Sequence, residues 1–197
     1  MIAVMGASGN TGGEVARRLL AEGERVRVLG RSRERLSELE AAGAGVAIGD
    51  ASDAGYLVDA FAGADAVYTL MPYDPAHPDY HGQQARLGTA VADAIERAGI
   101  TQVVALSSLG AEVASGTGVI ASLHAQERRL RALDGVDVLF MRPGVFYETF
   151  YGSLEFIAEA GFLGDVVAPE RAVPMVASRD VAAFAARALA GREFSGQ

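Results

Sequence analysis

Short apolar runs alternate with amphipathic segments along most of the chain. The apolar runs have the length of buried β-strands, and the segments between them carry apolar residues at helical spacing. Strands are predicted at 1–5, 25–30, 46–49, 65–70, 102–108 and 136–141. Helices are predicted at 14–22, 32–42, 52–62, 82–98, 119–133 and 181–190. This alternation favours an α/β fold, a doubly wound parallel sheet with helices on both faces.

A glycine-rich turn, residues 6–12, joins the first predicted strand to the first helix. Gly6 can leave the strand at backbone angles closed to other residues. Gly9 has no side chain to keep a diphosphate away from the backbone amides, and Gly12 lets the helix lie close to the sheet. A turn of this kind between strand and helix predicts a dinucleotide site, and tight packing alone is the alternative.

The helix that follows this turn begins with groups suited to an anion. Its first N–H groups have no partner within the helix, and the helix dipole places partial positive charge there. Ser8, Asn10 and Thr11 can add side-chain donors. The predicted ligand of this helix start is the pyrophosphate of a dinucleotide.

The end of the second predicted strand bears on which dinucleotide fits. An NAD site usually has an acidic residue here for the ribose 2′-hydroxyl, whereas NADP needs cations for its 2′-phosphate. This chain has Arg31 and Arg33 and no acid before Glu34. NADP(H) is therefore favoured over NAD(H), with solvated arginines at a helix entry as the alternative.

The ends of the next two strands are expected to lie along the same nucleotide. Asp50 and Ala51 follow the third strand, where Asp50 could accept from the adenine amine or, alternatively, cap the next helix. Leu70 and Met71 leave the fourth strand and should pass under the cofactor ribose. Ligands of open parallel sheets gather at these carboxyl ends.

Two serines follow the fifth strand at the same edge of the sheet. Ser107 is predicted to contact the cofactor and Ser108 to take part in catalysis. Turn or capping duty is the alternative for both.

His77 and His81 lie in the loop between the predicted strand 65–70 and the predicted helix 82–98, and they suggest a metal site. Pro78, however, prevents one regular helix from presenting both histidines. We expect no metal there, and instead a loop beside the substrate.

Composition excludes several classes of function. The chain has 25 acidic and 17 basic residues and a net charge of -8, which argues against a nucleic-acid footprint. Cysteine is absent, so disulfides and thiolate chemistry are excluded. Every basic residue is arginine. The lack of lysine excludes a P-loop lysine, a Schiff base and the Tyr-x-x-x-Lys pair of ordinary short-chain dehydrogenases.

The length of 197 residues fits one domain over 1–197. No apolar run has the length of a membrane span, and no basic and apolar leader precedes the first strand, so a cytoplasmic protein without membrane contact is expected. Residues 145–175 depart from the strand and helix rhythm. This segment is expected to contribute a small, incomplete cover for the substrate.

Separated motifs occur at 6–12, Arg31, 107–111, 136–146 and 178–182. Together they resemble the NmrA-like branch of the atypical short-chain dehydrogenase/reductases. The resemblance implies a Rossmann-like sheet in the order 3-2-1-4-5-6 with an optional seventh strand, and NAD(P) binding. Its members include quinone reductases, isoflavone-reductase relatives and redox-sensing regulators without catalysis.

Two departures from this family pattern affect the expected chemistry. The helix that carries Tyr-x-x-x-Lys in ordinary members here reads His124-Ala125-Gln126-Glu127, so no standard proton donor can be carried over. Family members usually continue beyond the strand that 194–197 begins, and add a C-terminal substrate lobe. An incomplete substrate pocket is therefore expected.

Two functions follow from these observations. The first is an NADPH-dependent reductase of a quinone or another small carbonyl or enone, with Tyr147, Ser108 or His124 as proton donor. The second is a non-catalytic NADP(H)-sensing protein that acts through a partner protein. A homodimer is also compatible with the sequence. The aromatic residues expected to line a flat substrate slot are Tyr73, Phe146, Tyr147, Phe150 and Tyr151.

Overall fold

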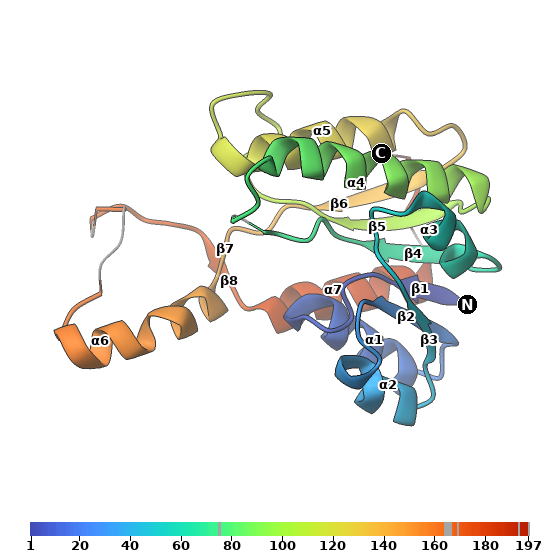
Figure 1. The fold of residues 1–197 in the computed structure, drawn as a ribbon, viewed down its shortest axis with the longest axis horizontal. Coiled ribbons are helices and arrows are strands. Elements are labelled where there is room, and N and C mark those ends of the chain that lie inside the picture. The colour runs from blue at the N-terminus through green and yellow to red at the C-terminus, as the bar shows by residue number, and fades with distance from the viewer. Residues whose placement is uncertain (75, 164–166, 169, 193, 197) are drawn as a thin grey trace.

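Six parallel strands form the central sheet of the computed structural model, which describes residues 1–74, 76–163, 167–168, 170–192 and 194–196. The strand order is β3-β2-β1-β4-β5-β6, as predicted (Figure 1). The strands are β1 (Ile2–Val4), β2 (Val26–Gly30), β3 (Gly45–Ile48), β4 (Ala66–Thr69), β5 (Gln102–Leu106) and β6 (Asp137–Met141).

Helices cover both faces of this sheet (Figure 1). One face carries α1 (Asn10–Ala21), α2 (Ser37–Ala41) and α7 (Ser178–Gly191), and the other carries α3 (Ala54–Phe61), α4 (Tyr80–Arg97) and α5 (Ala121–Arg131). Short 3₁₀ helices, η1 (Glu34–Leu36) and η2 (Gly118–Ile120), precede α2 and α5.

Side chains of the central strands alternate between the two faces. In β1, Ile2 and Val4 join the core under α1 and α7, whereas Ala3 joins the core under α3 and α4. All three residues are fully buried. A strand buried on both faces is apolar throughout, which explains why the sequence shows an apolar run there and no apolar and polar alternation.

The parallel register brings the ends of the strands to one edge of the sheet. Val4 pairs with Val28 on one side and with Tyr68 on the other, and Leu106 pairs with Met141. The segments that follow β1, β2, β4, β5 and β6 therefore leave the sheet in the same direction. This edge is where the predicted functional residues meet.

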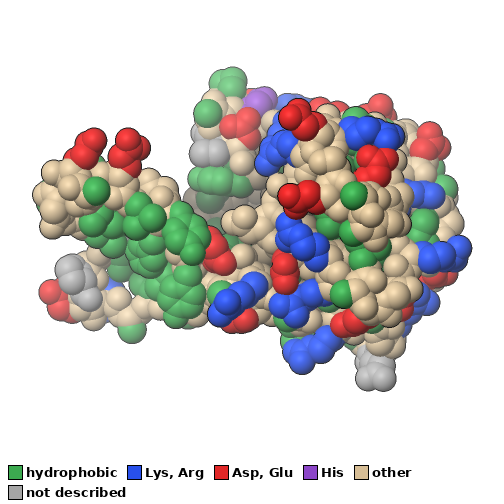
Figure 2. Space-filling view, turned by 90° about the horizontal axis from the view of Figure 1, so that it is seen from below, with side chains coloured by type: hydrophobic (Ala, Val, Ile, Leu, Met, Phe, Trp, Pro, Cys, Tyr) green, Lys and Arg blue, Asp and Glu red, His purple; other side chains and the backbone are tan. Residues whose placement is uncertain are grey.

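A second part of the chain projects from the main body (Figure 1). It contains a two-stranded parallel sheet of β7 (Val145–Phe146) and β8 (Met175–Val176). Between these two strands the chain forms η3 (Tyr147–Ser153) and α6 (Leu154–Ala160). Figure 2 shows hydrophobic side chains gathered on this projecting part. Within the predicted substrate-covering segment 145–175, residues 164–166 and 169 lie outside the described residues.

Glu148 ties the projecting part to the start of α7. Its carboxylate accepts from the backbone N–H of Ser178 at 2.9 Å and from the Ser178 hydroxyl at 2.6 Å. The hydroxyl bond lowers the pKa of Glu148 most, while burial acts in the opposite direction. Glu148 thereby binds the first N–H of α7, which begins at Ser178, before the predicted start at 181, and Asp180 lies in the first turn of this helix.

The chain segment expected to begin a seventh strand meets the edge of β6. The backbone N–H of Val138 donates to the carbonyl of Gly196 at 3.0 Å, and the Gly196 N–H donates to Asp137 Oδ1 at 2.6 Å. Residues 194–196 form no strand, and Gln197 lies outside the described residues.

Among the helices the structure describes, none combines the length and hydropathy needed to cross a membrane.

Candidate functional site

A cavity of about 610 Å³ opens at the carboxyl edge of the sheet, beside the ends of β1, β2, β3 and β4. Its walls come from residues far apart in the sequence, including the glycine-rich turn and the start of α4. The predicted cofactor residues that line it are Gly6, Ser8, Gly9, Thr11, Arg31, Asp50, Ala51 and Leu70. Of the others, Asn10 is exposed, Gly12 is buried inside α1, and Met71 and Ser107 line a second cavity.

The glycine-rich turn has the backbone geometry that its sequence predicts. Gly6 leaves β1 with φ +65°, a left-handed conformation that favours glycine, and its carbonyl accepts from the Gly9 N–H at 2.9 Å. A Cβ at Gly12 would lie 2.6 Å from the carbonyl oxygens of both Gly6 and Met5. Helix α1 therefore approaches the turn more closely than any residue with a side chain would allow.

The start of α1 is open to an anion. Gly9 precedes the helix in an extended conformation without a side-chain cap, and the first turn contains no acidic residue. The unpaired N–H groups and the helix dipole therefore present positive potential beside the cavity. An uncapped helix start, a glycine cradle and adjacent space fit a diphosphate.

Three arginines line the cavity, Arg31, Arg35 and Arg86, and only Arg31 was predicted. Arg86 forms an ion pair with Asp79. Arg33 points to Glu40, with which it forms an ion pair, and it does not line the cavity. Arg31 and Arg35 line the cavity, and Arg35 Nη2 donates to the Ser8 carbonyl at 3.2 Å. Among described residues, neither has an acidic partner within ion-pair distance. No spacing in the sequence distinguishes Arg35 from Arg33, because Arg31 lies before η1 and helical spacing does not apply to it.

Asp50 forms a local turn at the cavity rim. Its Oδ1 accepts from the N–H and the hydroxyl of Ser52, each at 2.8 Å. The hydrogen bond from the Ser52 N–H is the main reason why the pKa of Asp50 is lowered. The Ser52 hydroxyl and the charge of Arg31 lower this pKa further, whereas burial raises it. The cap of α3 is instead Asp53, which accepts from the Gly55 N–H at 2.8 Å. The alternative of Asp50 as the helix cap is therefore wrong.

Gln83 is a cavity residue that the sequence analysis missed. It lies on α4, and its Oε1 is buried without a hydrogen-bond partner in the described part of the chain. A buried amide oxygen ordinarily has a partner, so a donor from a ligand would satisfy it. Amphipathic spacing identified the helix, but it did not show which polar position faces this cavity.

A second cavity of about 300 Å³ lies beside the ends of β5 and β6. Ser107 and Ser108 line it together with Met71, Tyr73 and Phe146. The remaining aromatic residues of the predicted slot lie elsewhere. Tyr147 is 54% and Tyr151 72% exposed, and neither they nor Phe150 line this cavity.

The predicted proton donors occupy different surroundings. Ser108 lines the second cavity, and its hydroxyl donates to the Leu109 carbonyl at 3.0 Å. His124 lies outside the cavity, and its Nδ1 bonds the Ala111 carbonyl at 2.8 Å, which requires the proton on Nδ1. Tyr147 also lies outside it. The structure thus brings only Ser108 of the three into this cavity.

Tyr80 also lines the second cavity, and the sequence analysis did not identify it. It begins α4, and its ring lies 5.9 Å from that of Tyr73 in an edge-to-face arrangement. Burial raises the pKa of the Tyr80 phenol, and Tyr73 raises it further. The phenol therefore keeps its proton at neutral pH.

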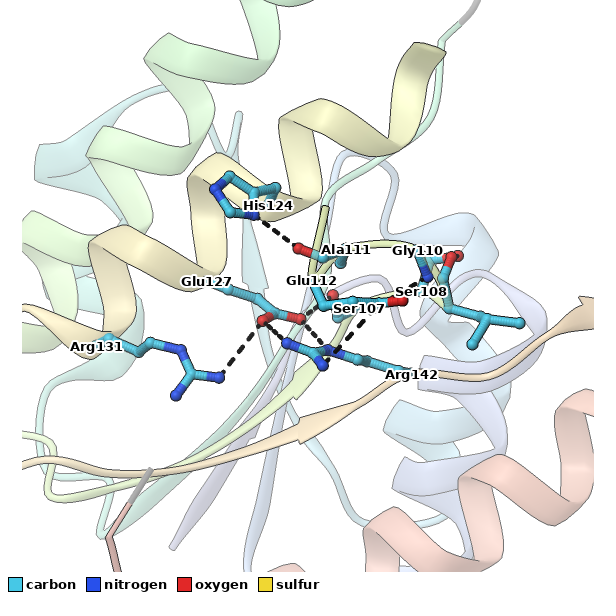
Figure 3. A network of polar contacts seen from close by, with 10 residues as sticks. Ser107, Ser108, Gly110, Ala111, Glu112, His124, Glu127, Arg131 and Arg142 are labelled. Carbon is cyan, nitrogen blue, oxygen red and sulfur yellow. Dashed lines mark hydrogen bonds and ion pairs between the residues drawn. The ribbon is translucent and has the colours of Figure 1, made fainter. Parts of the chain in front are cut away.

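A buried carboxylate lies behind Ser107 (Figure 3). Glu127, 5% exposed, accepts from the Ser107 hydroxyl at 2.6 Å and from Arg142 Nε at 2.8 Å, both on Oε1. Its Oε2 pairs with Arg142 Nη2 and, at 3.6 Å, with Arg131 Nη2. Burial raises the pKa of Glu127, but the bonds from Arg142 and Ser107 and the two guanidinium charges together lower it below the ordinary value.

The histidines considered for a metal site are engaged separately. His77 lines the first cavity and its Nδ1 accepts from the Asp79 N–H at 3.1 Å, whereas His81 Nδ1 lies 3.0 Å from the Ser122 hydroxyl. No group of three or more potential metal ligands occurs within the ranges that the structure describes.

Known proteins are similar to this chain over nearly its whole length. The family model for NAD(P)H-binding proteins matches residues 6–192. A (4-alkanoyl-5-oxo-2,5-dihydrofuran-3-yl)methyl phosphate reductase from Streptomyces griseus is 34% identical over 197 residues, which are 100% of this chain and 66% of the relative. An NAD(P)H azoreductase from Xenophilus azovorans is 28% identical over 191 residues, 96% of this chain and 63% of that protein.

Solved structures give the same picture. The NADPH complex of an NADPH-dependent quinone oxidoreductase from Escherichia coli superposes with a TM-score of 0.84 at 25% identity, over 100% of this chain and 67% of that one. The NADP(H) complex of a triphenylmethane reductase from Citrobacter superposes with a TM-score of 0.79 at 25% identity, over 95% and 65%. The chain thus spans about two thirds of the length of these relatives.

Proposed function

This chain belongs to the NAD(P)H-binding family, in the NmrA-like branch of the atypical short-chain dehydrogenase/reductases, and on that basis we propose that it is an NADPH-dependent reductase of a small quinone, carbonyl or enone. One observation carries the proposal. The first cavity combines an uncapped helix start with two arginines, Arg31 and Arg35, that form no ion pair with an acidic side chain among the described residues.

Residues of the first cavity fit the adenosine half and the pyrophosphate of NADPH. The N–H groups at the start of α1 would hold the pyrophosphate. Arg31 and Arg35 would hold the 2′-phosphate, because a guanidinium can donate two parallel bonds to phosphate oxygens. Gln83 and the free oxygen of Asp50 are the acceptors available to the adenine amine.

Residues of the second cavity fit the nicotinamide ring and the substrate. When bound, NADPH supplies a hydride, so reduction of a carbonyl also needs one proton. Ser108 and Tyr80 both line this cavity and could donate that proton. The Tyr80 phenol is protonated at neutral pH, as a proton donor must be, and its raised pKa makes it a weaker acid than an ordinary tyrosine. Tyr73 and Phe146 provide flat apolar walls for an aromatic acceptor.

Turnover is the direct test of this proposal. We expect the protein to oxidise NADPH in the presence of at least one compound from a panel of quinones, aldehydes and enones, followed by the loss of absorbance of NADPH. Calorimetric titration with NADP, NADPH and NAD measures binding independently. Binding without oxidation by any compound would favour the sensing function, and failure to bind any of the three nucleotides would refute the assignment.

A side chain at position 12 should weaken dinucleotide binding. In Gly12→Ala the new Cβ would lie 2.6 Å from two carbonyl oxygens, so α1 must move away from the turn that holds the diphosphate. Overpacking of this kind costs about 1 to 3 kcal/mol, and a cost of this size in the bound state corresponds to a loss of NADP affinity of about 5- to 150-fold. Isothermal titration calorimetry measures this effect.

Gly152→Ala is the matched control for this substitution. A Cβ at Gly152, in η3, meets no described atom within 4 Å, so its affinity for NADP should equal that of the wild type. An unchanged affinity in Gly12→Ala would mean that the close approach of α1 does not shape the binding site.

A further inference from the structure

The direction of the hydrogen bond between Ser107 and Glu127 is fixed by the surroundings of the carboxylate. Arg142 and Arg131 approach both carboxylate oxygens, and guanidinium groups offer only donors (Figure 3). Glu127 is therefore ionised and can only accept. Since a serine hydroxyl has a single proton, the 2.6 Å contact uses that proton on Glu127 Oε1.

The charges around this contact hold it in place. Arg142 bonds Glu127 through Nε and Nη2, while its Nη1 lies 3.8 Å from Glu112 Oε2. Arg142 follows β6 and Ser107 follows β5, whose exits are joined because the Ser107 N–H donates to the Met141 carbonyl at 2.7 Å. The Ser107 side chain is thus held both by its backbone and by the carboxylate.

The Ser107 side chain can offer a ligand only an acceptor. Ser107 lines the second cavity at 8% exposure, its hydroxyl proton and its N–H are both used, and its oxygen retains lone pairs. A ligand group that donates a hydrogen bond would be favoured at this point. A carbonyl or carboxylate oxygen would face another acceptor and be disfavoured.

We propose that Ser107 accepts a hydrogen bond from the carboxamide N–H of the nicotinamide ring, and that Glu127 is the positioning residue that makes Ser107 an acceptor. This inference rests on the proposed function. The β4–β6 half of a doubly wound sheet is the second mononucleotide-binding half, and Ser107 lies deep at its strand edge. Substrate would lie further from the sheet, near the less buried Ser108.

Two nucleotides that differ in one group test this proposal. The 3-acetylpyridine analogue of NADP carries a methyl group where NADP has the amide nitrogen, so it keeps the carbonyl and loses the donor. We expect wild-type protein to bind NADP about fivefold more tightly than the analogue, measured by calorimetry without substrate. In Ser107→Ala the ratio of the two dissociation constants should fall to about one.

Glu127→Gln tests the positioning role without altering the cavity wall. Both Arg142 and Arg131 approach Oε2, whereas Oε1 faces Ser107 and only Arg142 Nε, so the amide oxygen should take the place of Oε2 and the amide N–H₂ that of Oε1, beside Ser107. The Ser107 proton would then turn toward the cavity, and the ratio should again fall to about one. A general structural change would weaken both nucleotides equally and leave the ratio unchanged.

Ser178→Ala is the matched control. It removes a serine-to-glutamate bond of the same length, 2.6 Å, outside both cavities, and should keep the wild-type ratio. Equal affinities of wild type for the two nucleotides, or an unchanged ratio in Ser107→Ala, would overturn the inference and leave the proposed function intact. The same holds if Ser107→Ala changes only the KM of a hydroxyl-bearing substrate. If the wild-type protein bound neither NADP nor the analogue, this inference and the proposed function would both be overturned.

Discussion

Replacing Glu127 with alanine should lower the free energy of unfolding by about 3 to 5 kcal/mol. Glu127 is 5% exposed and satisfies Arg142 and the buried Ser107 hydroxyl at once. Its removal leaves a guanidinium and a hydroxyl without their acceptor. Arg142 is 32% exposed, so water can hydrate part of its charge, and the lower end of the range is expected. Denaturant unfolding at neutral pH measures the loss.

Removing both charges should be milder than removing one. In the double variant Glu127→Met with Arg142→Met, the charges that lose a partner are those of Arg131 and Glu112, whose side chains are 40% and 50% exposed and can be hydrated. Most of the lost stability should therefore return. Glu40→Ala is the control, because it breaks the exposed pair with Arg33 and should cost less than about 1 kcal/mol. A loss of that small size in Glu127→Ala would show that the buried carboxylate does not stabilise the fold.

The same carboxylate predicts a dependence on pH. The folded-state pKa of Glu127 is lowered from the ordinary value of 4.5, so its stabilising effect is fully present above that value. It is lost as the pH falls through the lowered folded-state pKa. The difference in stability between wild type and Glu127→Gln should therefore be constant near neutral pH and shrink in acid.

Replacing both Arg31 and Arg35 with alanine should raise the Kd for NADP on the order of a hundredfold, since each charge-assisted bond contributes about 1.5 to 3 kcal/mol. The Kd for NAD should change much less, because NAD has no 2′-phosphate. Both arginines line the first cavity. Calorimetric titration of both nucleotides against wild type and variant separates phosphate recognition from a general loss of binding.

Arg33→Ala is the matched control within the same segment. Arg33 belongs to the same run of alternating arginines, but it pairs with Glu40 outside the cavity and should leave the Kd for NADP unchanged. Equal losses for NAD and NADP in the double variant would mean that neither side chain meets the 2′-phosphate. A loss in Arg33→Ala comparable to that in Arg35→Ala would contradict the assignment of Arg35.

Local sequence determined the architecture of this protein and the place of its site. Apolar runs buried on both faces, separated by amphipathic helices, were sufficient to predict the parallel sheet, because strand and helix periods are local properties. The roles of Gly6 and Gly12 could also be predicted from the sequence. A positive φ at Gly6 and a close backbone approach at Gly12 disfavour a side chain whatever the rest of the fold.

Tertiary structure alone decided which side chains face the two cavities. Arg33 and Arg35 are equivalent in the sequence, and only the path of η1 turns Arg33 to Glu40 and leaves Arg35 beside Ser8. Likewise, no spacing showed that Glu127 would reach Arg142 behind Ser107. Contacts between residues far apart in the chain depend on how separate elements pack, and the directions of polar side chains follow from that packing.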